Sequence, residues 1–193
     1  MTVSAALRAI VLPVSTSPVS EVESLKVGDP SEADDVEMGP VISAEQQERV
    51  LGFLERLDAK ATVVTGGGSV GDRGFFVQPT IVADVTQDAE IVQREVFGPV
   101  VTVQRFSSDD EAIELANGVR YGLAASVFSR DVSRALGAAR KLAFGTVWIN
   151  EHLFPLTSEM PHGGFKESGY GKDMSLYSME EYTRVKHVVA KLG

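Results

Sequence analysis

The segment Gly66-Gly67-Gly68-Ser69-Val70-Gly71 satisfies the G-x-G-x-x-G pattern with which glycine-rich turns hold the pyrophosphate of a dinucleotide. That chemistry needs a helix directly after the third glycine of the pattern, because the N–H groups at the helix N-terminus face the phosphates. Here Asp72-Arg73-Gly74 leads into β-branched and aromatic residues and then Pro79. The sequence therefore predicts a turn between two strands, and no phosphate site at these glycines.

Side chains suited to other chemistry are few. With no cysteine there is no thiol nucleophile, disulfide or thiolate metal site, and three histidines without matching carboxylate spacing give no metal signature. A net charge of -9 disfavours nucleic acid and anionic lipid as partners. The apolar runs are far shorter than the roughly 20 residues that cross a bilayer, and the N-terminus lacks the pattern of a signal peptide. We therefore expect a cytoplasmic protein that binds small molecules or other proteins.

Hydrophobic periodicity and capping patterns predict the elements that position the polar side chains. Ser43 with Gln46 forms a capping-box pattern before a predicted helix of about four turns, and strands are expected on both sides of the glycine turn. Ser108 begins a second helix, which Gly118 ends at the C′ position. The later predicted strands and helix are Val100–Val103, Ala124–Ser129, Asp131–Leu142 and Gly145–Asn150.

Strands that alternate with helices of about ten residues predict an α/β fold with a parallel sheet and flanking helices. We expect three parallel strands between Val100 and Asn150, with the two intervening helices packed on the sheet. Ligands of such sheets bind at the carboxyl ends of the strands, which favours the segment after Asn150 as a site. The tail, Tyr182 to Leu192, alternates valines with basic residues and is predicted as a surface strand.

A set of motifs occurs in the order and at the spacing found in the NAD-dependent aldehyde dehydrogenase superfamily, and the chain resembles the C-terminal, catalytic-domain portion of these enzymes. The motifs are Val27-Gly28-Asp29-Pro30, Met38-Gly39-Pro40-Val41-Ile42-Ser43, Gly74-Phe75-Phe76-Val77-Gln78-Pro79-Thr80, Glu95-Val96-Phe97-Gly98-Pro99-Val100, Tyr121-Gly122-Leu123-Ala124-Ala125, Gly145-Thr146-Val147-Trp148-Ile149-Asn150, Pro161-His162-Gly163-Gly164-Phe165-Lys166-Glu167-Ser168-Gly169 and Glu181-Tyr182-Thr183. Within the superfamily, the segments 158–164 and 168–173 are most similar to the branch that oxidises γ-aminobutyraldehyde or betaine aldehyde.

The resemblance assigns cofactor contacts to Glu95 and Phe97. In the family this glutamate hydrogen-bonds the hydroxyls of the nicotinamide ribose, and this phenylalanine packs near the nicotinamide ring. A carboxylate can accept two hydroxyl protons at once, and an aromatic edge limits where a flat ring can move. Taken alone, a glutamate and a phenylalanine before a strand are more often a solvated charge and a core side chain.

The resemblance also places the loop after Asn150 along the aldehyde tunnel. The residues of this loop that inherit a substrate position are Glu151, His152, Phe154, Glu159 and His162. The two glutamates can face a substrate ammonium, and Phe154 can add a cation–π contact. The alternative is that loop glutamates are solvated and that each histidine makes a structural hydrogen bond.

Aldehyde oxidation in the family needs residues that this chain lacks. A cysteine thiolate attacks the aldehyde, hydride passes to the nicotinamide, and a glutamate activates the water that hydrolyses the thioester. The stretch Thr2-Val3-Ser4-Ala5-Ala6-Leu7-Arg8 resembles the segment that begins at that cysteine, which puts Val3 at the nucleophile position. The base glutamate, the oxyanion-hole asparagine and the dinucleotide-binding domain precede this point in the family, so we expect a truncated protein that is inactive alone.

Three hypotheses therefore remain open. The chain is catalytic only when another chain supplies the N-terminal half; or it is a non-catalytic interaction protein that pairs with full-length aldehyde dehydrogenase subunits; or it is a degraded reading frame. For all three we expect a divergent segment over residues 1–26, a catalytic-domain portion over 27–180 and a C-terminal oligomerisation strand over 181–193. Implied partners are NAD, bound weakly or not at all by this chain alone, an aldehyde if the chain is complemented, and further copies or full-length subunits.

Overall fold

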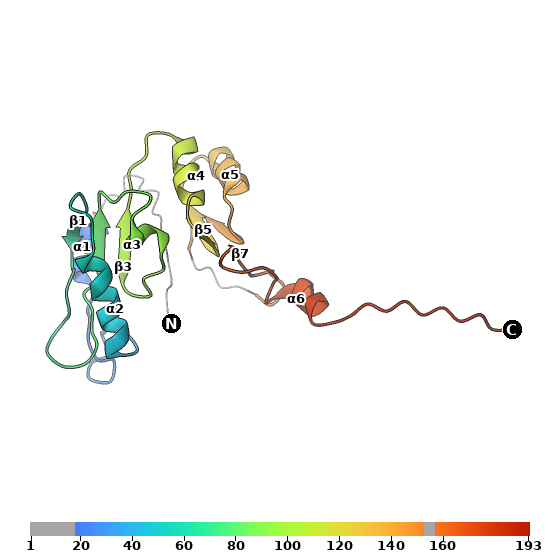
Figure 1. Cartoon of the computed structure of the whole chain (residues 1–193), viewed down its shortest axis with the longest axis horizontal. Coiled ribbons are helices and arrows are strands. Elements are labelled where there is room, and N and C mark those ends of the chain that lie inside the picture. Colours follow the sequence, from blue (N-terminus) through green and yellow to red (C-terminus); the bar gives the residue numbers. More distant parts are fainter. Residues whose placement is uncertain (1–17, 153–156) are drawn as a thin grey trace. The chain divides into compact units, whose positions relative to one another are not determined.

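A computed structural model describes residues 18–152 and 157–193 of the chain (Figure 1). Strands and helices alternate along these residues, and two of the sheets contain parallel pairs, so the predicted α/β class is confirmed. Contacts between backbone segments divide the chain into two units, with the boundary between Val119 and Arg120.

The first unit is built on a three-stranded sheet in the order β1-β2-β3. β1 (Thr62–Thr65) pairs antiparallel with β2 (Thr80–Ala83), which pairs parallel with β3 (Val100–Val103) so that Thr80 lies opposite Val100. Three of the four residues of β2 are buried, as expected for a central strand covered on both faces. The helix α1 (Pro18–Ser24) packs against β1 and β2.

The glycine-rich segment is a turn between β1 and β2, as predicted. The backbone N–H of Gly67 donates to the Thr80 hydroxyl at 2.9 Å, and that of Gly68 donates to the Gln78 side chain at 3.1 Å. No helix begins directly after Gly71, because the next element in the described residues is β2. These N–H groups are satisfied by the protein itself, so they do not form a phosphate cradle.

The helix α2 (Ala44–Glu55) begins where the capping pattern predicts. The Ser43 hydroxyl accepts a hydrogen bond from the N–H of Gln46 at 3.2 Å, and Val50 and Phe53 are buried on the inner face. The helix ends a turn earlier than predicted. The short helix α3 (Glu90–Gln93), which comes after β1 and β2 along the chain, contacts α2.

The helix α4 (Asp109–Asn117) begins at Ser108 as predicted, but its end corrects the prediction for Gly118. This glycine is the C-cap, with φ of -75°, and does not adopt the left-handed conformation expected at C′. The side chain of Gln87 closes the helix instead, because its Nε2 donates to the carbonyls of Leu115 at 3.1 Å and Gly118 at 2.9 Å. A Cβ at Gly118 would lie 2.8 Å from this nitrogen, so the glycine leaves room for the cap.

The second unit contains two small sheets. β5 (Ala124–Val127) and β6 (Thr146–Ile149) pair parallel, and the helix between them, α5 (Val132–Lys141), packs on both strands. β4 (Tyr121–Gly122) and β7 (Phe165–Lys166) pair antiparallel. The helix α6 (Ser175–Glu181) follows β7.

The predicted set of three parallel strands between Val100 and Asn150 is therefore only partly right. β5 and β6 form the expected parallel pair with α5 packed on both, but the parallel partner of β3 is β2. In the described residues, β3 shares no sheet with β5 or β6. Local periodicity indicates that a segment is a strand, but it does not identify the distant segment with which the strand pairs.

The C-terminal tail has no partner within the chain that the structure describes. After α6, residues 184–193 belong to no helix or strand, and Figure 1 shows them as an extended segment. Val185 is 100% exposed and Leu192 is 90% exposed. A strand in this tail would therefore have to pair with another chain, and the predicted oligomerisation strand stays a prediction.

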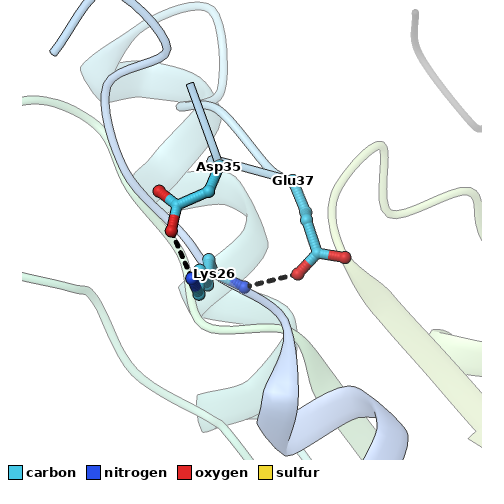
Figure 2. A network of polar contacts seen from close by, with 3 residues as sticks. All are labelled: Lys26, Asp35 and Glu37. Atoms are coloured by element: carbon cyan, nitrogen blue, oxygen red, sulfur yellow. Dashed lines mark hydrogen bonds and ion pairs between the residues drawn. The ribbon is translucent and has the colours of Figure 1, made fainter. Parts of the chain in front are cut away.

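A polar network closes the loop that precedes α2 (Figure 2). The Lys26 ammonium pairs with the Asp35 carboxylate, and the Lys26 backbone N–H donates to the Glu37 carboxylate at 3.1 Å. The Lys26 carbonyl in turn accepts from the N–H groups of Glu37 at 2.9 Å and Met38 at 3.1 Å. The two ends of the loop are thereby fixed to each other.

Candidate functional site

The turn Glu95–Pro99 lies between α3 and β3. It contains both of the predicted cofactor residues, Glu95 and Phe97. Phe97 has φ of 58°, a left-handed conformation that costs a residue other than glycine about 1–2 kcal/mol. Its side chain is 48% exposed, although phenylalanine is normally buried. A strained, exposed aromatic residue needs support from its surroundings, and it is typical of a functional position.

Three side chains of α2 supply that support. The Gln46 amide nitrogen donates to the carbonyls of Val96 at 3.2 Å and Phe97 at 2.8 Å. Arg49 donates from Nη2 to the Glu95 carbonyl at 2.7 Å. Val50 fills the space beside Gly98, where an added Cβ would lie 2.5 Å from the Val50 side chain.

Glu95 itself is half-buried, and burial raises the pKa of its carboxyl above the ordinary value, while the nearby charge of Arg49 lowers it in part. Within residues 18–152 and 157–193, no group donates a hydrogen bond to this carboxylate. A partly desolvated carboxylate without a donor is costly for a protein and fits a ligand that brings hydroxyl groups. The residues present thus fit the ribose diol of a dinucleotide cofactor.

In the second unit, two hydrogen bonds join the segments that follow β5 and β6. Asn150, with φ of 56°, accepts from the N–H of Ser129 at 2.7 Å and donates to the Ser129 carbonyl at 2.9 Å. Asparagine tolerates the left-handed conformation better than most residues. This double hydrogen bond fixes the point at which the predicted substrate loop leaves the sheet.

Two of the predicted substrate residues, Glu151 and His152, lie directly after this point. The His152 Nδ1 is 2.6 Å from the Ser126 hydroxyl on β5, and its ring lies edge-on to Trp148 on β6 at 5.2 Å. The exposed Glu151 carboxylate accepts from the N–H of His152 at 2.8 Å. His152 is therefore held against the strands by one ring nitrogen.

The other predicted substrate residues are farther along the loop. Glu159 is exposed, and hydrogen bonds from the Thr157 hydroxyl, its own backbone and Ser158 lower the pKa of its carboxyl. His162 is paired through Nδ1 with the Asp173 carboxylate at 2.8 Å. Phe154 and the predicted nucleophile position, Val3, lie outside the described residues.

The structure brings Glu95 together with Phe97 in the first unit and Glu151 together with His152 in the second. It shows contacts for Glu159 within its own loop and pairs His162 with Asp173, which lies between β7 and α6. Arg49 and Asp173 were not among the predicted site residues, because nothing in their spacing along the sequence indicates their distant partners. Among the described residues, no three histidine, aspartate or glutamate side chains are placed to hold a metal ion, and no helix is both long and apolar enough to span a membrane.

Comparison with known proteins gives the class of this chain. An aldehyde dehydrogenase from Aspergillus niger is 44% identical over 169 residues, which are 87% of this chain and 34% of that protein. Betaine aldehyde dehydrogenase from Bacillus subtilis is 43% identical over 175 residues, 88% of this chain and 35% of the relative. The crystal structure of a point mutant of betaine aldehyde dehydrogenase from Staphylococcus aureus in complex with NAD+ matches with a TM-score of 0.83 and 41% identity, covering 88% of this chain and 35% of that one.

The relatives and the solved structure are all named as aldehyde dehydrogenases. The model of the aldehyde dehydrogenase family matches residues 9–188. The chain belongs to the aldehyde dehydrogenase family, and the predicted resemblance is confirmed. It spans about a third of the length of the relatives that it matches.

Proposed function

We propose that this chain provides the nicotinamide-ribose contact and the aldehyde-tunnel portion of an NAD-dependent aldehyde dehydrogenase. The observation that carries the proposal is the half-buried Glu95 carboxylate, which has a raised pKa and no donor among the described residues. It sits next to the exposed ring of Phe97 on a turn that α2 holds in place. NAD, when bound, would accept the hydride. Glu95 would hold its ribose hydroxyls, and Phe97 would limit the position of its nicotinamide ring.

The proposed substrate is an aminoaldehyde, oxidised to the carboxylic acid. Glu151 and Glu159 are exposed carboxylates on the loop that follows β6, and either can face a cationic substrate group. The lowered pKa of Glu159 keeps that carboxyl ionised to a lower pH. Relatives that are named betaine aldehyde dehydrogenase support a substrate with a cationic nitrogen. His152 and His162 each have one ring nitrogen engaged within the protein, so a substrate role falls to the other nitrogen.

The chain is proposed to be inactive alone and to work in the cytoplasm when a partner chain supplies the remaining parts. The matched region is about a third of the relatives, and the sequence contains no cysteine. Complementation by a second chain would provide the thiol, the base and the adenine end of the cofactor site.

Glu95→Gln tests the cofactor contact. Nicotinamide mononucleotide is titrated into the chain while backbone NMR signals are followed, and we expect shifts at Glu95–Pro99. The variant should bind about tenfold more weakly, because hydrogen bonds to a charged group contribute about 1.5–3 kcal/mol. Glu48→Gln on the exposed face of α2 is the control and should bind like the wild type. Equal affinity in Glu95→Gln and wild type would refute the proposed contact.

The same variant should also be more stable than the wild type at neutral pH. Because the folded-state pKa of Glu95 is raised, its contribution to stability is present below the unfolded value of about 4.3 and is lost as the pH rises through the folded pKa. Glutamine is neutral at every pH, so the variant does not lose this stability as the pH rises. Urea unfolding followed by circular dichroism should show a stability gain at pH 7 that disappears near pH 4, and a variant less stable at pH 7 would contradict the assignment of burial as the cause.

A second candidate function, a non-catalytic interaction protein that pairs with full-length aldehyde dehydrogenase subunits, is favoured by the C-terminal tail. Val185, Val188, Val189 and Leu192 are all at least 74% exposed in the chain alone. Exposed apolar residues on an extended segment are suited to adding a strand to another sheet.

Both candidates predict association through this tail. Light scattering of the purified chain should show dimers or larger assemblies, and deletion of residues 181–193 should shift the population toward monomers. Substituting Val185 and Val189 with threonine, which keeps the extended preference and removes apolar surface, should weaken association without removing the tail. A monomer that is unaffected by the deletion would contradict both the homo-oligomer and the pairing role.

A further inference from the structure

Three successive carbonyl groups of the turn Glu95–Pro99 are bound by the same helix. Arg49 binds the carbonyl of Glu95, and the Gln46 amide binds those of Val96 and Phe97, all at 3.2 Å or less. Residues 46, 49 and 50 are separated by three and four positions, so they lie on one face of α2. These carbonyls have no partner in the sheet, because β3 begins only at Val100.

We propose that Arg49 is a positioning residue, which fixes the Glu95–Pro99 turn so that Glu95 and Phe97 keep the geometry needed for a nicotinamide ribonucleoside ligand. The inference rests on the proposed function of Glu95 and goes beyond it by assigning a role to a residue on another element. Arg49 acts through the backbone of Glu95, so it need not touch the ligand.

The charge of Arg49 gives it a second effect on Glu95. Burial raises the pKa of the Glu95 carboxyl, and Arg49 provides the opposing electrostatic influence. Removing Arg49 therefore frees the turn and also favours the protonated carboxyl, which accepts hydrogen bonds less well than the carboxylate. Both effects weaken a ligand that offers hydroxyl groups.

Arg56, the C-cap residue of the same helix, is a matched control. The guanidinium carbons of Arg49 and Arg56 each lie 5.3 Å from the centroid of the Phe53 ring, so both cover this core residue. Arg56, however, pairs with Glu90 at 3.0 Å and makes no hydrogen bond to the turn in the described structure. Arg→Met substitutions at the two positions thus remove similar packing, and only one of them releases the turn.

The test compares the wild type with Arg49→Met, Arg49→Lys and Arg56→Met. The Glu95 carboxyl is titrated by carbon NMR in each chain, and nicotinamide mononucleotide is titrated at pH 7. We expect Arg49→Met to raise the Glu95 pKa further and to weaken nucleotide binding about fivefold to tenfold, which matches the net contribution of one ordinary hydrogen bond. Arg49→Lys should keep most of the pKa effect but lose affinity, because an ammonium does not reproduce the planar geometry.

Arg56→Met should leave both the Glu95 titration and the affinity at wild-type values. If Arg49→Met changes them no more than Arg56→Met does, the positioning role is wrong. If the wild type does not bind the nucleotide at all, the proposed function fails, while the Glu95 titration and the turn signals still decide whether Arg49 fixes the turn. Circular dichroism of both methionine variants verifies that each remains folded.

Discussion

The purified chain is expected to form no NADH from an aminoaldehyde and NAD, and Val3→Cys is expected not to change this. The sequence contains no thiol that could attack the aldehyde. A thiol restored at position 3 would still lack a bound nicotinamide and a base, and removing such groups each costs orders of magnitude in rate. Glu95 and Phe97 alone offer few contacts, so we expect NAD affinity in the millimolar range or weaker, roughly 4 kcal/mol.

Two measurements check this expectation. NADH absorbance is followed with wild type and Val3→Cys, and NAD affinity is measured by calorimetry. Full-length betaine aldehyde dehydrogenase from Bacillus subtilis, a relative of this chain, serves as the positive control for the assay. Turnover that persists after any contaminating full-length enzyme is removed, or micromolar affinity for NAD, would show that the chain carries more of the site than we propose.

Gly145→Ala is expected to cause the largest loss of stability among single substitutions in the second unit. A Cβ at Gly145 would lie 2.8 Å from the carbonyl carbon of Gly163 and closer still to its oxygen. Because these are backbone atoms, no side-chain rotation can relieve the overlap. Overpacking of this kind costs about 1–3 kcal/mol or more, and here we expect the upper end.

Urea unfolding followed by the fluorescence of Trp148, the single tryptophan, reports on this unit directly. Gly137→Ala in α5 is the control, since a Cβ there would meet nothing within 4 Å. It should stabilise the helix by about 0.5–1 kcal/mol. A Gly145→Ala chain as stable as the wild type would mean that Gly163 does not approach β6 this closely in solution.

Local signals in the sequence predicted the parts of the fold that depend on neighbouring residues. Ser43 and Ser108 cap the helices expected to follow them, and Asp131, where a third helix was predicted to begin, is its cap. Each side chain accepts a hydrogen bond from the N–H three residues later. The glycine segment was also correctly predicted as a turn between two strands, because a helix signal was missing after Gly71. Such features need only a few consecutive residues to form.

Features that depend on distant residues could not be predicted in this way. The end of α4 is closed by Gln87, which is 31 residues before Gly118, so the C′ prediction for this glycine was wrong. The partner of β3 was missed for the same reason. At the candidate site, Glu95 and Phe97 were found through a family motif, but the Arg49 contact spans 46 positions and has no signature in the sequence.

The loop closed by Lys26 has a practical consequence for labelling the protein. The N–H of Gly28 donates to the carbonyl of Met38 at 3.1 Å, so the two ends of the loop lie next to each other. Residues 29–35 between them are exposed. An inserted epitope or fluorophore-binding tag between Ser31 and Asp34 would lengthen a closed loop, at about 0.6 kcal/mol for each doubling of its length. We expect such an insertion to leave the conformations of the start of α2 and of the turn at Glu95 unchanged.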